Sequence, residues 1–160
     1  MIRSEKPNFI VFTGDIVTGS PASTMWKRLI DSLNTYKIPF CVTLGNHDAE
    51  QDISRQEIAR LVTSSPYCLN TLNKANELAD IRLDIVSQAE KKTAFSLYCM
   101  DSHDYSTIEG IGGYGWFSNE QIEWLKSSCK EHTKNNGGKP IPSLRSEEHT
   151  SELQSLVIIS

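Results

Sequence analysis

The chain has 160 residues, of which 38% are hydrophobic, and its 20 acidic and 16 basic residues give a formal net charge of −4. This length and composition are typical of one globular domain. They exclude a strongly basic nucleic-acid-binding protein, and the absence of any run of 18 apolar residues excludes a transmembrane helix. We therefore expect a soluble monomer that has neither a nucleic acid nor a membrane as its partner. The sequence points to no particular cellular compartment.

Two short apolar runs each end in a polar motif. Residues 9–13 are followed by Gly14-Asp15, and residues 40–44 are followed by Gly45-Asn46-His47-Asp48. Runs this short, rich in β-branched and aromatic residues and stopped by glycine, predict buried strands. One helix-length segment separates them, and in open α/β sheets ligands bind at the carboxyl ends of the strands. The two motifs therefore favour a divalent-metal site and metal-assisted hydrolysis.

The segment between these runs predicts an amphipathic helix of about 15 residues. Its apolar positions share one face and are Trp26, Leu29, Ile30 and Leu33. After the second motif, Ser54 and Glu57 have the spacing of a capping box, which predicts the start of another helix. Residues 67–80 are polar and irregular, so we expect a surface excursion there.

The next two strands are predicted to form a hairpin. Residues 81–86 alternate between apolar and polar side chains, and residues 94–100 form another strand-like run after a short polar turn. The second run ends in Asp101-Ser102-His103, which has the form of a metal-binding Asp-x-His. In the glycine-rich loop that follows, Tyr114 and Trp116 are expected either to line a cleft or to pack in the core.

A third helix is predicted to begin at the capping box of Ser118 and Gln121. We expect its buried face to consist of Ile122, Leu125 and Cys129. His132 near its C-terminus is expected to be only a favourable cation there.

The last part of the chain changes character at about Arg145. Residues 145–155 match the translation of a common sequencing-library adapter, and such segments are excluded from fold reasoning. We therefore expect residues 1–144 to form a partial domain and residues 145–160 to be a non-native tail. No strand is expected after the third helix.

The two strand-end motifs resemble those of the calcineurin-like metallophosphoesterases. The motifs Asp101-Ser102-His103, Gly113-Tyr114-Gly115-Trp116 and Gln121-Ile122-Glu123-Trp124-Leu125 are most similar to the branch related to purple acid phosphatases. The resemblance covers residues 8–144. It implies an α/β (α+β) fold class, as a fragment of a four-layer β-sandwich with flanking helices.

The resemblance also implies a role for each residue of the site. Asp15 is the expected bridging ligand of two metal ions and Asn46 a ligand of the second. His47 is the expected catalytic acid, and Asp48 its partner that holds the imidazole in place. The ions are two divalent or trivalent metals, since these ligands suit iron, manganese or zinc. The implied reaction is hydrolysis of a small-molecule phosphate mono- or diester.

The family pattern includes ligands that this sequence lacks. These are an Asp-x-His upstream of Asp15, a His on the strand after the last helix, and a Gly-His-x-His. Since the family's Asp-x-His precedes Asp15, Asp101 and His103 are expected to orient neighbours near the site or simply to end a core strand. We thus expect a domain cut at both ends and inactive as it stands.

The sequence admits two other functional classes. A non-catalytic fragment or degenerate domain without bound metal is the main alternative. A metal-independent hydrolase is disfavoured because the sequence has no nucleophile elbow of the G-x-S-x-G type.

Overall fold

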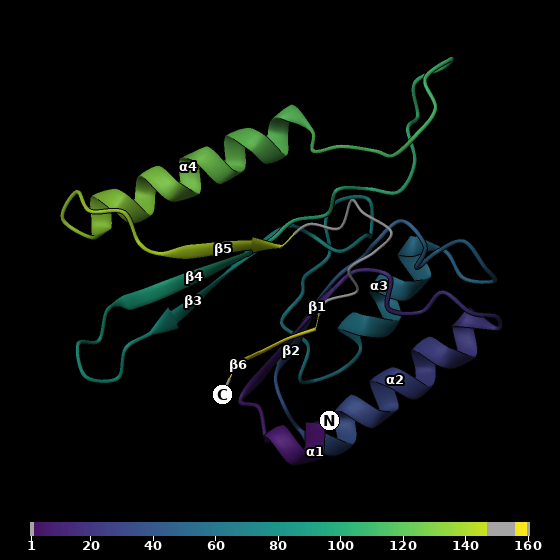
Figure 1. Cartoon of the computed structure of the whole chain (residues 1–160), viewed down its shortest axis with the longest axis horizontal. Coiled ribbons are helices and arrows are strands. Elements are labelled where there is room, and N and C mark those ends of the chain that lie inside the picture. The colour runs from purple at the N-terminus through teal and green to yellow at the C-terminus, as the bar shows by residue number, and fades with distance from the viewer. Residues whose placement is uncertain (1, 147–155, 160) are drawn as a thin grey trace.

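The protein folds into four layers, in the order helices, sheet, sheet and helix (Figure 1). The structure is a computed structural model that describes residues 2–146 and 156–159. Its elements in chain order are α1 (Ile2–Glu5), β1 (Phe9–Thr13), α2 (Ala22–Tyr36), β2 (Phe40–Thr43), α3 (Arg55–Thr63), β3 (Ile81–Val86), β4 (Thr93–Cys99), α4 (Asn119–Asn135), β5 (Ser143–Ser146) and β6 (Leu156–Ile159). The predicted α/β sandwich with flanking helices is confirmed.

The first sheet places the two polar motifs at one edge. Its strand order is β2-β1-β6, with β1 parallel to β2 and antiparallel to β6. In the parallel pair, Thr13 lies opposite Thr43. Both strands end within two residues of their motifs, so Asp15 and Asn46 emerge at the same carboxyl edge of the sheet.

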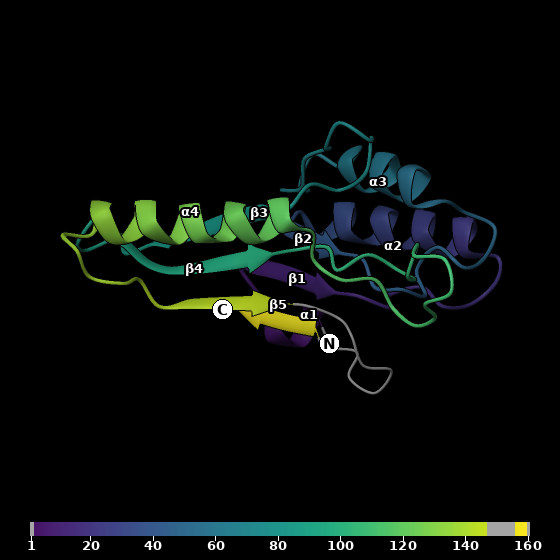
Figure 2. The ribbon, with the colours of Figure 1, turned by 90° about the horizontal axis from the view of Figure 1, so that it is seen from above.

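Helices α2 and α3 cover the outer face of the first sheet (Figure 2). α2 has the predicted 15 residues and buries Trp26 and Leu33 in one cluster with Phe40 of β2. α3 begins with the predicted capping box, since the Glu57 backbone N–H donates to Ser54 Oγ at 3.3 Å and the Ser54 N–H donates to the Glu57 carboxylate at 2.9 Å. The two reciprocal bonds satisfy donors that a helix N-terminus otherwise leaves unpaired.

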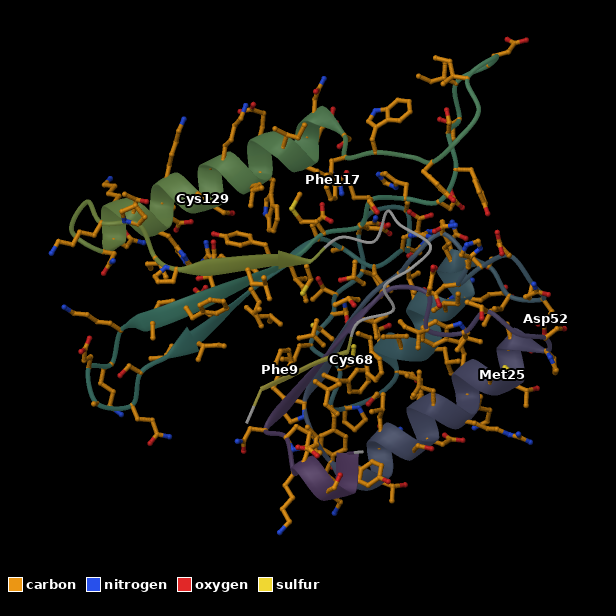
Figure 3. The ribbon with its side chains drawn as sticks, viewed as in Figure 1. Phe9, Met25, Asp52, Cys68, Phe117 and Cys129 are labelled. Atoms are coloured by element: carbon orange, nitrogen blue, oxygen red, sulfur yellow. The ribbon has the colours of Figure 1, made fainter. Side chains whose placement is uncertain are left out.

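The N-terminus of α2 takes its cap from a distant loop. The residue before α2, Pro21, provides no side-chain cap. Asp52 replaces it: its carboxylate accepts hydrogen bonds from the Ala22 N–H and from the Ser23 hydroxyl. Figure 3 shows Asp52 beside the start of α2. The bond from Ser23 is the main reason why the pKa of Asp52 is lowered. Asp52 therefore ties the loop after β2 to the start of α2.

The two sheets face each other across a second apolar cluster. Val11 and Cys41 of the first sheet pack against Leu97 and Cys99 of the second. The two facing thiols are free, and their Sγ atoms lie 3.5 Å apart. Alternate residues of β1 thus point to opposite layers, since Ile10 belongs to the cluster beneath α2 and α3.

The second sheet has the strand order β3-β4-β5 and is covered by α4. β3 and β4 form the predicted antiparallel hairpin. The face of β4 that is turned away from the first sheet meets α4. There Tyr98 and Trp124 contact edge to face, with ring centroids 6.0 Å apart. Ser96 and Tyr98 are buried because α4 completes this fourth layer.

The expected buried face of α4 is wrong at Ile122, which is 38% exposed. Leu125 is half-buried, and Cys129 is exposed although its thiol lies 3.6 Å from the Tyr98 hydroxyl, whereas Ser128 and His132 are buried. His132 Nδ1 lies 3.2 Å from Ser96 Oγ, and its Nε2 lies 3.1 Å from an Asp84 carboxylate oxygen. The expectation that His132 is only a helix-end cation is therefore also wrong, because it joins α4 to both strands of the hairpin.

A strand follows α4 where none was expected. β5 pairs with β4 in parallel, with Leu144 opposite Leu97, and it crosses the expected boundary at residue 144. β6 pairs with β1 further along the chain. Residues 147–155 and 160 lie outside the described residues, so the non-native origin of residues 145–160 stays a prediction. No helix in the described part of the chain is long and apolar enough to cross a membrane.

Candidate active site

Asp15 lies in the turn after β1, and its carboxylate contacts the loop after β2 that carries Asn46 and His47. It has a positive φ of 47°, directly after Gly14 with φ 109°. Asp15 Oδ1 accepts a hydrogen bond from the His47 backbone N–H at 3.0 Å. A Cβ atom at Gly45 would lie 2.3 Å from the same oxygen, so only glycine permits this approach. Asp15 is 7% exposed, and its position depends on the loop that carries Asn46 and His47.

Asp48 is fully buried and holds the two strand-end loops together. Its Oδ1 accepts backbone N–H bonds from Ile16 at 2.7 Å and Val17 at 2.9 Å, and its Oδ2 accepts one from Gly45 at 2.9 Å. Burial raises the pKa of Asp48, and these three bonds oppose the rise. The structure therefore directs this carboxylate to backbone donors, and its predicted action on the His47 ring stays a prediction.

The imidazole of His47 pairs with Glu50, which the sequence analysis did not select. His47 Nδ1 lies 2.7 Å from a Glu50 carboxylate oxygen, and the other oxygen accepts a hydrogen bond from the Tyr105 hydroxyl. The bond to Glu50 raises the pKa of His47, whereas the bonds from Tyr105 and His47 lower the pKa of Glu50. The i, i+3 spacing of His47 and Glu50 was the available sequence signal.

Asn46 lies beside this group and is 8% exposed. Its amide Nδ2 is buried and has no hydrogen-bond partner among the residues that the structure describes. The bond to Glu50 raises the pKa of Tyr105, and the nearby Asn46 side chain opposes this rise. A buried amide with spare bonding capacity is unusual, because such groups are normally satisfied.

Asp15 and Asn46 fit part of a metal centre but not a whole one. A carboxylate and an amide oxygen are suitable ligands for hard cations, and the two residues emerge at one sheet edge. No group of three or more His, Cys, Asp or Glu side chains that could hold a metal ion occurs in the described part of the chain. A complete centre therefore needs further ligands besides these two.

Asp101 is linked to the site by Arg55. The structure does not show Asp101 as a metal ligand. An Arg55 guanidinium nitrogen lies 2.5 Å from an Asp101 carboxylate oxygen, and another donates to the Gly45 carbonyl at 3.2 Å. Both side chains are largely buried, with 11% and 12% exposure. Arg55 thus links the Asn46 loop to the end of β4. His103 lies two residues further on and contacts Gln121 of α4 at 3.3 Å.

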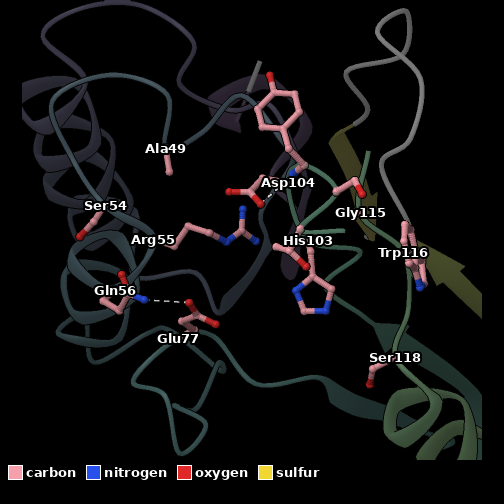
Figure 4. Close-up of a pocket in the computed structure, with 13 residues that line it drawn as sticks. Ala49, Ser54, Arg55, Gln56, Glu77, His103, Asp104, Gly115, Trp116 and Ser118 are labelled. Atoms are coloured by element: carbon pink, nitrogen blue, oxygen red, sulfur yellow. Dashed lines mark hydrogen bonds between the residues drawn. The ribbon is translucent and has the colours of Figure 1, made fainter. Parts of the chain in front are cut away.

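A cavity of about 650 Å³ opens beside the His47 loop (Figure 4). It lies between the N-terminus of α3, the turn around Glu77 and the loop at residues 103–118. Its lining includes Ala49, Arg55, Glu77, Asp104, Tyr105 and Trp116. Trp116 is 51% exposed, so the cleft alternative holds for this residue and the core alternative does not.

A sequence model of the calcineurin-like phosphoesterases matches residues 1–150. The chain belongs to this family. Among curated proteins, this phosphoesterase-family chain is similar to "Probable inactive purple acid phosphatase 29" of Arabidopsis thaliana, with 30% identity over 159 residues that cover 89% of the chain and 40% of the relative. It is also similar to "Phosphatase DCR2" of Saccharomyces cerevisiae, with 27% identity over 178 residues that cover 96% of the chain and 30% of the relative.

These relatives confirm the predicted branch of the family. The chain spans two fifths or less of the length of the two relatives named. No solved structure matches it. The names of these two relatives differ on activity, since one is called inactive and the other a phosphatase.

Proposed function

We propose that the protein containing this chain hydrolyses phosphate mono- or diesters at a binuclear metal centre. Asp15 and Asn46 contribute two of the ligands, and His47 is the catalytic acid. The observation that carries the proposal is the close contact between the segments that follow β1 and β2. Asp15 Oδ1 accepts the His47 N–H at 3.0 Å, in a contact that glycine at position 45 alone allows.

Each residue of the candidate site has its own role in the proposed reaction. A pair of metal ions, when bound, supplies an acidified water and a clamp on the phosphoryl oxygens. Asp15 would hold the ions as their shared anionic ligand, and Asn46 would add a neutral oxygen that does not repel a phosphate. His47 is partly exposed, and Glu50 occupies its Nδ1. The proton on Nε2 is therefore the one directed to the leaving oxygen of the ester.

The test uses the complete gene product and measures bound metal and turnover separately. Asp15→Asn is expected to lower both, because it removes the shared anionic ligand. His47→Gln is expected to keep the metals and to lower kcat by about 10²–10⁴-fold, the usual contribution of acid–base catalysis. Asp31→Asn, on the exposed side of α2, is the matched control. Loss of metal in the His47 variant would contradict the acid role.

A non-catalytic domain is the second candidate. It is favoured by the name of the Arabidopsis relative, which is called inactive, and by the lack of a three-ligand cluster in the described residues. Under either candidate, we expect the 160-residue chain alone to hold no stoichiometric metal and to show no turnover of p-nitrophenyl phosphate above a protein-free control. Elemental analysis separates the candidates, because the complete gene product holds metal only under the first one.

A further inference from the structure

We propose that the cavity of about 650 Å³ beside His47 binds the leaving group of the ester and selects an uncharged aromatic one. This inference rests on the proposed function and extends it to the substrate class. The preferred substrates are thus aryl phosphates, in preference to sugar phosphates or substrates that carry further phosphate groups.

The position of the cavity follows from the role of His47. A catalytic acid protonates the leaving oxygen, so the leaving group must lie on the side of that acid. His47 itself does not line the cavity, but two of its neighbours do. They are Ala49, two residues after His47, and Tyr105, whose hydroxyl donates to the Glu50 carboxylate that holds His47. A volume of about 650 Å³ is within the usual range of about 300–1,000 Å³ for small-molecule sites.

The outer wall of the cavity is aromatic without being part of a core. Trp116 and Tyr105 line it and are 51% and 44% exposed, whereas Tyr114, which is 45% exposed, lies outside the lining. Tyr105 and Tyr114 are stacked, with centroids 6.1 Å apart and an angle of 23° between their planes. Exposed rings that bury little surface of their own offer a binding face for another ring.

The backbone fixes these rings in place. The Gly115 N–H donates to the Asp104 carbonyl at 3.1 Å, and the Ser106 N–H donates to the Gly113 carbonyl at 2.9 Å, so the loop closes like a hairpin. A Cβ atom at Gly115 would lie 2.9 Å from that of His103, so the loop packs tightly on the end of β4. A wall held in this way loses little conformational freedom when a ligand binds.

The charges of the cavity disfavour an anionic leaving group. Its one guanidinium, Arg55, is already paired with Asp101. Glu77 and Asp104 add two carboxylates to the lining. Apart from the His103 imidazole, a second phosphate in this cavity would meet two carboxylates and no unpaired guanidinium or ammonium group, whereas an uncharged ring meets none of this repulsion.

The first test compares two substrates in the complete gene product. Trp116→Ala is expected to lower kcat/KM for phenyl phosphate by about tenfold, mainly through KM, because a ring contact is lost. It should change kcat/KM for glycerol 2-phosphate less than about twofold. Ile111→Ala is the matched control, since Ile111 is 54% exposed on the same loop but does not line the cavity. Equal losses on both substrates would overturn the proposal.

The second test needs no turnover. Saturation-transfer NMR with phenol, the leaving group itself, is expected to show binding to the wild-type protein and to Ile111→Ala but not to Trp116→Ala. Glycerol should show no transfer. Phenol binding without any phosphoesterase activity would support the cavity and reject the proposed function. Turnover without phenol binding or a phenyl preference would support the proposed function and reject the cavity.

Discussion

Gly45 is the residue on which the geometry of the candidate site depends most directly. The site needs the Asp15 carboxylate and the Asn46 loop in contact, and the space between them is too small for any side chain at position 45. The Gly45 carbonyl also accepts a bond from Arg55, and its N–H donates to Asp48. One residue without a side chain thus meets three charged residues of the site.

We expect Gly45→Ala to displace Asp15 and to lower stability. The added Cβ atom would lie 2.3 Å from Asp15 Oδ1 and 2.5 Å from the Asp15 nitrogen, so backbone must move. Forcing an extra methyl group into a packed place typically costs about 1–3 kcal/mol. Denaturant unfolding measures this loss. Gly112→Ala is the control, because nothing lies within 4 Å of its Cβ position; an equal effect there would show that the contact is not the cause.

We expect Glu50→Gln to lower the pKa of His47 toward its ordinary value of 6.5. The hydrogen bond to the Glu50 carboxylate favours the charged imidazole, and an amide in its place favours it less. Because folding raises the pKa of His47, the His47–Glu50 pair contributes its full stabilisation below pH 6.5. This stabilisation is lost as the pH rises through the raised pKa. NMR titration of the His47 ring in both proteins gives the shift; identical titrations would contradict the pairing.

The helices and strands that have a local residue pattern could be predicted from the sequence. The runs at residues 9–13 and 40–44 end at glycine, and the structure has strands there. The capping boxes at Ser54 and Ser118 are both formed. Since parallel strands present their carboxyl ends at one edge, the meeting of Asp15 and Asn46 followed from these strands alone.

The sequence was insufficient where contacts join distant segments. Tyr105 lies 55 residues after Glu50, and no local pattern indicates that the two meet. The buried face of α4 was misassigned because the helix meets polar strand residues, so that Ser128 and His132 are buried in place of the apolar Ile122 and Cys129. A hydrophobic periodicity argument cannot detect a face that is held by hydrogen bonds.

We expect His132→Ala to loosen α4 from the second sheet. The variant removes the buried imidazole of His132 together with its bonds to Ser96 and Asp84. A hydrogen bond within a protein typically contributes about 0.5–1.5 kcal/mol to stability. Lys130→Ala, two residues away on an exposed position of the same helix, should change stability by less than about 0.5 kcal/mol. Equal unfolding midpoints for the two variants would contradict a connecting role for His132.

For the molecule as a whole, the open question is whether residues 145–160 belong to the fold. If they are a non-native tail, as the sequence indicates, their deletion should leave the circular dichroism spectrum and the melting temperature unchanged. The structure pairs β6 with β1 and the end of β5 with β4, so a native segment would behave differently. A cooperative loss of stability on deletion would show that these strands complete the two sheets.

The way in which the strands are connected also has a consequence for folding kinetics. β3 and β4 are joined by a short turn and pair along nearly their whole length, so their contacts are local. β1 and β2 are parallel and must close a loop that contains all of α2 before they can pair. Local pairings form in microseconds, whereas pairings that require long loops are slower. We therefore expect the hairpin to be an early structure and the edge that carries Asp15 and Asn46 to be among the last parts to form, so that the candidate site would be assembled only in the final steps of folding.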